Sequence, residues 1–159
     1  MTASVKTSIT ANILTTLAAV DGTAPYNYNL SRTQQVTLYG RHPSTFSTWP
    51  SIVVEETGDA GDLGQTCGYD ERTAKLTLIC AVREGDEAAA RASAQALVAD
   101  IQRALHADYT RGGYAWDTHV DDSANEFDVA TLPIVTFTVG VTVNYRHGVK
   151  DPTSLAPSM

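Results

Sequence analysis

Four side chains that can bind a metal ion lie close together in the sequence: Asp117, His119, Asp121 and Asp122. Asp117 and His119 are two positions apart, so on a strand they share a face. Carboxylate oxygens with one imidazole suit a divalent ion. The chain lacks a second histidine at ligand spacing, a His-Glu-x-x-His pair and an Asp-x-Asp-x-Asp-Gly loop. We therefore expect polar loop residues in water here, and no metal site.

The two cysteines, Cys67 and Cys80, are the candidate nucleophiles, because the chain has no Gly-x-Ser-x-Gly motif. Cys80 lies within an alternating apolar segment, where a thiol is inert. Nothing next to Cys67 in the sequence marks a base. The spacing does not fit a Cys-x-x-Cys metal or redox motif. We expect reduced thiols, with a disulfide between the two as the alternative.

Glycines at positions 58, 61, 64 and 68 invite comparison with a phosphate-binding loop. A Walker loop needs Gly-Lys-Ser or Gly-Lys-Thr before a helix, and a dinucleotide fingerprint needs Gly-x-Gly-x-x-Gly. Neither spacing is met, and carboxylates that repel phosphate lie in the same segment: Glu55, Glu56, Asp59 and Asp62. We expect a flexible connection between strands, no cofactor and no enzymatic activity.

Composition indicates one globular domain without affinity for nucleic acid. The 159 residues are 43% hydrophobic and 18% charged, with a net charge of −7. Binding to phosphates requires clustered Lys and Arg, whereas an acidic surface suits a protein that DNA passes without sticking. No apolar run is long enough to cross a bilayer, and the first residues do not resemble a secretory signal. We therefore expect the protein to stay in the cell that makes it, away from membranes.

Two segments have the apolar periodicity of amphipathic helices. In residues 7–20 the apolar positions recur at spacings of three and four, and Asp21-Gly22 ends the pattern. Residues 86–106 form the second helix, with Asp86 as its N-cap. Its apolar stripe comprises Ala90, Ala94, Leu97, Val98, Ile101 and Leu105, and Asp100 falls on the polar side. The remaining alanines reflect either high helix propensity or close approach of another subunit.

Strand patterns lie between and after these helices. Residues 73–82 and 133–145 alternate apolar and polar side chains, which is typical of half-buried antiparallel strands. Shorter strands are expected at 35–39, 51–55 and 114–120, with loops at 55–69 and 121–128. The chain is predicted to be a single α+β domain over residues 1–145. Two helices pack on one face of a mostly antiparallel sheet of four to five strands, and residues 146–159 form an extended arm.

Several segments in this order resemble the tail terminator, or tail completion, family of long-tailed phages. An amphipathic helix precedes the strand Pro50-Ser51-Ile52-Val53-Val54-Glu55, and a polar turn at Asp70-Glu71-Arg72 leads into an alternating strand. A helix with a Leu-Val-x-x-Ile pattern follows. The chain closes with a long strand that ends Asn144-Tyr145-Arg146, and then Lys150-Asp151-Pro152. The resemblance covers residues 5–152 and lies in order, length and pattern.

The resemblance implies a structural virion protein at the head-proximal end of the tail. Family members are α+β subunits that form hexameric rings on the completed tail tube. The ring stops polymerisation of the tube protein and provides the surface to which the head-completion or neck protein attaches, while DNA passes through the lumen. A head-to-tail ring of identical subunits closes on itself and offers a face unlike that of the tube.

The family has no motif that assigns the contacts to single residues, so we predict them from exposure and position. The candidate subunit or tube contacts are Trp49, Asp59, Asp62, Tyr145, Arg146 and Lys150. Three alternatives remain open: another head-to-tail connector or neck protein, a small-molecule-binding or enzymatic α+β domain, and a cellular oligomer unrelated to phages.

Overall fold

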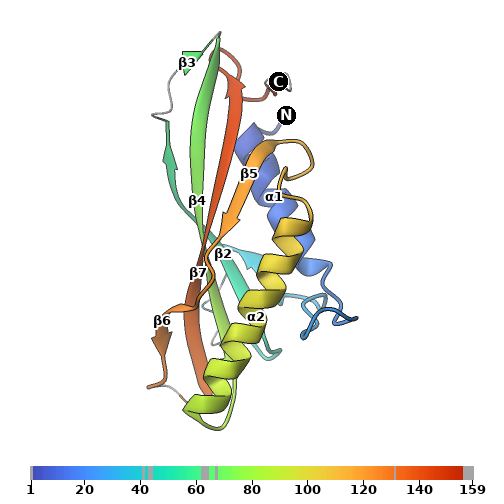
Figure 1. The fold of residues 1–159 in the computed structure, drawn as a ribbon, viewed down its shortest axis with the longest axis vertical. Coiled ribbons are helices and arrows are strands. Elements are labelled where there is room, and N and C mark those ends of the chain that lie inside the picture. Colours follow the sequence, from blue (N-terminus) through green and yellow to red (C-terminus); the bar gives the residue numbers. More distant parts are fainter. Residues whose placement is uncertain are drawn as a thin grey trace.

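The computed structural model describes residues 2–40, 42, 45–61, 65–66, 68–130 and 132–155. These residues form two helices and seven strands in a long, twisted arrangement (Figure 1). The order is α1 (Val5–Ala18), β1 (Val36–Leu38), β2 (Ser51–Ala60), β3 (Gln65–Thr66), β4 (Tyr69–Arg83), α2 (Glu87–Ala107), β5 (Ala115–Val120), β6 (Asn125–Asp128) and β7 (Ile134–Gly148). The α+β class predicted from the sequence is confirmed.

One sheet contains all the strands, in the order β1-β2-β4-β7-β5, with β3 added to β4 and β6 added to β7. Every pairing is antiparallel except that of β1 with β2. The central pair is β4 and β7, whose 15 residues each align from Tyr69↔Gly148 to Arg83↔Ile134. The expected four to five strands were too few, because β3 and β6 are too short to show an alternation.

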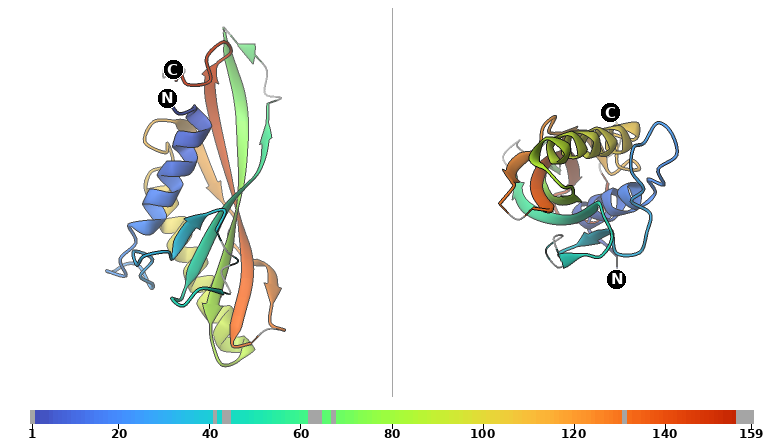
Figure 2. Two further views of the ribbon diagram at one scale, coloured as in Figure 1. Left: turned by 180° about the vertical axis from the view of Figure 1, so that it is seen from behind. Right: turned by 90° about the horizontal axis from the view of Figure 1, so that it is seen from below.

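Both helices begin at capping side chains. Ser4 accepts a hydrogen bond from Thr7 N, and Asp86 accepts one from Ala89 N, as N-caps do. The buried stripes of the two helices join a single core with the apolar residues of β4 and β7. Because these strand residues alternate, they all lie on one face of the sheet. Seen from below, both helices lie on the concave side of the curled sheet (Figure 2).

Two segments expected to be loops are partly strands. The segment after residue 55 continues as β2 to Ala60 and includes β3, because backbone pairing with β4 extends across the glycines. A β-bulge between Glu56 and Gly58 accommodates the irregular sequence. Likewise, residues 125–128 pair with β7 as β6, although three of the four side chains are polar.

The predicted C-terminal arm begins later than expected and folds back. Arg146 and His147 belong to β7, which ends at Gly148. The chain then turns, so that Gly148 N donates to Ser154 O, and Pro152 O accepts from Val5 N at the start of α1. Asp151 stabilises this turn by accepting from Thr153 N and Thr153 Oγ1. The described part of the tail is therefore attached to the domain and is not extended. Within the described residues, no helix combines the length and apolar character needed to cross a bilayer.

Candidate assembly surface

The free end of the β4–β7 ribbon carries a group of charged and polar side chains, which we call the clasp: Lys6, Asp59, Asp70, Arg72 and Tyr145. The Tyr145 hydroxyl lies 3.3 and 3.2 Å from the two carboxylate oxygens of Asp59. Arg72 donates from Nε to Asp59 at 3.2 Å and from Nη1 to Asp70 at 2.9 Å. Lys6 Nζ lies 4.0 Å from Asp59. Three strands and the first turn of α1 are thereby tied together.

The β-bulge in β2 explains why Asp59 reaches this group. Ile52, Val54 and Glu56 alternate toward the helix-covered face of the sheet. Without the bulge, residue 58 would be next on that face. The register shift instead pairs Asp59 with Ala74, and it places Asp59 on the same face as Tyr145, the last apolar position of β7.

Glu56, three residues before Asp59 in β2, connects α1 to the edge of the sheet. Its carboxylate accepts hydrogen bonds from Thr10 Oγ1 at 2.5 Å and from Tyr39 Oη at 3.1 Å. Lys6 Nζ lies 3.8 Å from the same carboxylate. Together with the clasp, these contacts hold the ribbon end rigidly against α1.

The opposite face of the ribbon end carries an exposed aromatic ring and a half-buried cation. Arg146 forms an ion pair with Glu71, and its guanidinium lies 4.7 Å from the centre of the Trp116 ring. Trp116 is 39% exposed. Arg146 Nε is buried and has no hydrogen-bond partner among the described residues. Trp and Arg are the residue types most enriched in interface hot spots.

Most of the predicted contact residues come together at this end. Asp59 and Tyr145 are hydrogen-bonded, Arg146 follows on the other face of β7, and Lys150 is exposed in the turn after the strand. Trp49 is not part of the group. It precedes the far end of β2, and at about 3.3 Å per residue it lies roughly 30 Å from Asp59. Asp62 lies outside the described residues.

Two of the side chains that could react, Tyr145 and Cys80, are kept protonated by their surroundings. Burial, followed by the nearby Asp59 carboxylate, raises the pKa of the Tyr145 phenol. Burial raises the pKa of the Cys80 thiol as well, and a protonated thiol is a poor nucleophile. Asp117 and His119 are both exposed on β5. No group of three or more His, Cys, Asp or Glu in the described part of the chain is arranged to hold a metal ion. Cys67 lies outside that part.

Two buried charged residues were missed by sequence reasoning. Asp100 was assigned to the polar face of α2 but is fully buried, because the loop at 25–28 covers it. Arg111 is also fully buried; it donates to the carbonyls of Leu105 and Asp108 at the end of α2, and to Asn12 Oδ1 at 3.2 Å. The asparagine-rich loop was a signal for the first, since Asn side chains and turn backbones often bind carboxylates. No signal in the sequence indicated that Arg111 would be buried.

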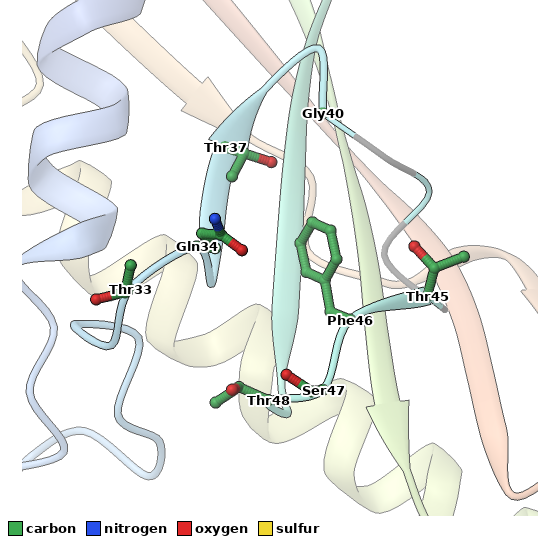
Figure 3. A pocket seen from close by; sticks show the side chains of 8 residues that line it. All are labelled: Thr33, Gln34, Thr37, Gly40, Thr45, Phe46, Ser47 and Thr48. Atoms are coloured by element: carbon green, nitrogen blue, oxygen red, sulfur yellow. The ribbon is translucent and has the colours of Figure 1, made fainter.

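A separate hollow of about 480 Å³ lies between β1 and the segment at 45–48 (Figure 3). Its lining comprises Thr33, Gln34, Thr37, Gly40, Thr45, Phe46, Ser47 and Thr48. None of these side chains is charged, so the described part of the lining contains no acid–base pair.

The fold and the ribbon end thus define a two-helix α+β protein with a rigid, charged projection and no assembled catalytic group among its described residues. A comparison with protein-family models finds no match to the chain, and a comparison with curated proteins finds none either.

Proposed function

We propose that this chain is a phage tail terminator. Its copies close into a hexameric ring on the head-proximal end of the tail tube, stop the addition of tube protein and present a surface for the head-completion or neck protein. The observation that carries the proposal is the ribbon end. It extends past the N-terminal end of α1, is made rigid by the clasp and exposes Trp116 beside Arg146 (Figure 1).

A rigid projection suits docking to a preformed tube, because little conformational freedom is lost on binding. Trp116 and Arg146 supply the aromatic and cationic anchors that dominate interface energetics. The Tyr145 hydroxyl is hydrogen-bonded to Asp59, and the Cys80 thiol is buried. Both observations favour an assembly role over a chemical one. The net charge of −7 repels phosphate and suits a lumen through which DNA moves.

The proposal is tested by measuring the mass of the purified protein by light scattering over a range of concentrations, with and without tail tubes. We expect either a hexamer in solution or a monomer that becomes a ring on tubes. A monomer at every concentration that also ignores tubes would overturn the proposal. A ring that binds the neck protein and not the tube would instead favour another head-to-tail connector.

Two matched arginine variants locate the docking surface. Arg146 pairs with Glu71 and stacks on Trp116, and Arg91 pairs with Glu87 and stacks on Phe127 at the other end of the molecule. Arg146→Ala should weaken tube binding at least roughly tenfold, as loss of an interface hot spot does. Arg91→Ala loses the same kinds of contact and should leave tube binding unchanged. Equal effects of the two would place the docking surface elsewhere.

A further inference from the structure

One segment near the C-terminal end of the chain carries carboxylates without any compensating Lys or Arg. Residues 112–145 contain five carboxylates and no Lys or Arg: Asp117, Asp121, Asp122, Glu126 and Asp128. All except Asp121 are exposed, and none forms an ion pair with a Lys or Arg in the described part of the chain. They lie on β5, on β6 and in the connection between these strands, which share one edge of the sheet beside β7. We call this the acidic edge.

The other edge of the sheet has the opposite charge. Residues 22–54 contain Arg32 and Arg41 and no Asp or Glu. Arg32 is exposed just before β1. Arg103 of α2 reaches the same region, where its Nη1 donates to Pro25 O at 2.9 Å, but its charge is paired with Asp100, so Arg32 supplies the exposed positive charge among the described residues. We call β1 and the adjoining loop with Arg32 the basic edge.

The topology separates these two edges by the whole width of the sheet. In the order β1-β2-β4-β7-β5, β1 is at one end, and β5 with β6 is at the other. The loop that carries Arg32 and strand β6 lie on opposite sides of the molecule in all views (Figures 1 and 2). Each outer strand pairs on only one side within the described residues, so backbone groups remain available for contact.

Exposed apolar side chains accompany the charges on both edges. Leu38 and Tyr39, at the end of β1, are 40% and 57% exposed. On the acidic edge, Leu132 is 41% exposed. Apolar anchors surrounded by complementary charge are the usual composition of a protein–protein contact, and each edge carries such side chains.

We infer that the acidic edge of one copy binds the basic edge of the next. The partner is therefore a second copy of this chain, in a head-to-tail arrangement. Because the two edges differ and lie on opposite sides, the contact is heterologous. Such a contact closes into a ring when a whole number of subunits completes a rotation of 360°. The inference rests on the ring of the proposed function and assigns its subunit interface.

Charge reversal tests the pairing. Arg32→Glu reverses the basic edge, and Asp122→Arg with Glu126→Arg reverses the acidic edge. Either change alone should weaken ring formation at least roughly tenfold, and all three together should restore it, because each contact then regains opposite charges. Lys75→Glu makes the same charge change as Arg32→Glu in the middle of the sheet and should have no effect. Ring formation of the native chain should also weaken as salt is raised.

Ring formation is measured by light scattering in solution and, if the native chain is monomeric there, by saturation of tail tubes. A native chain that forms no ring under either condition removes the proposed function together with this inference. A native ring that tolerates Arg32→Glu as well as it tolerates Lys75→Glu overturns only the assignment of the interface. Loss of the ring in both single-edge variants without rescue in the combined variant also overturns it.

Discussion

Asn27 donates three hydrogen bonds to the buried carboxylate of Asp100. Asn27 N lies 3.0 and 2.9 Å from the two oxygens, and Asn27 Nδ2 lies 2.9 Å from Oδ1. Tyr28 N adds another at 2.9 Å. A charge on α2 thus fixes the loop that leads to β1 and the basic edge, so the position of one proposed interface depends on a residue within the core.

Replacement of Asp100 by Ala should be strongly destabilising, because it leaves the donors of Asn27 and Tyr28 covered and unpaired. We expect the free energy of unfolding to fall by about 2–4 kcal/mol, measured by urea denaturation. Asp122→Ala, which removes an exposed carboxylate, should change it by less than about 0.5 kcal/mol. A loss below about 1 kcal/mol in Asp100→Ala would show that water replaces the carboxylate.

Gly140→Ala should destabilise the corner between β5 and β6. An added Cβ would lie 2.5 Å from Asp121 Oδ2, the atom that accepts from Gly140 N. The cost should be about 1–3 kcal/mol, as for other overpacked sites. Gly85→Ala is the control, because its Cβ would meet nothing within 4 Å. The combination of Gly140→Ala with Asp121→Ala should cost less than the sum of the two, and simple additivity would contradict the clash.

Tyr145→Phe should alter stability mainly at alkaline pH. The raised pKa of the folded phenol means that its contribution is complete below the unfolded pKa of about 10 and is lost as pH rises beyond it. At pH 7 the variant should lose about 0.5–1.5 kcal/mol with the Asp59 hydrogen bond. Above pH 10 the native chain should lose stability faster than Tyr145→Phe, so the difference between them shrinks. Tyr109→Phe, which changes an exposed ring, is the control and should be as stable as the native chain throughout. If the stability difference between Tyr145→Phe and the native chain stays constant with pH, the phenol of Tyr145 does not have a raised pKa.

Asp108 should contribute to stability only above acidic pH. The hydroxyl of Thr110 and the backbone N–H groups of Gly112 and Thr110 hold the pKa of its carboxyl below the ordinary value. A lowered pKa stabilises the fold above the unfolded pKa of about 3.9, and this contribution is lost as pH falls through the folded pKa. Asp108→Asn should therefore be less stable than the native chain at pH 7 and should approach it as pH is lowered below 4. Urea midpoints measured from pH 7 to pH 2 give the comparison.

The sequence predicted the elements in which apolar periodicity dominates. The stripe from Ala90 to Leu105 and the alternation from Val135 to Tyr145 each correspond to an observed helix or strand within a few residues. Strands β3 and β6 escaped prediction because backbone pairing with a long neighbour, and not side-chain pattern, defines them. The same cause extends β7 through Arg146 and His147.

The candidate surface was predicted only in part. Tyr145 and Arg146 were found because they end a clear apolar–polar alternation. The hydrogen bond of Tyr145 to Asp59, however, depends on the bulge at Glu56, which no local signal marks. The opposite signs of the two edges could be counted in the sequence. Their placement on opposite sides required the strand order, which long-range pairing determines.

The most direct test of the terminator proposal is the growth of tail tubes from purified tube protein, followed by electron microscopy with and without this chain. The proposal predicts that tube growth stops after this chain is added and that a ring-shaped density appears at one end of each tube. Tubes that continue to lengthen at the same rate, with bare ends, would contradict it.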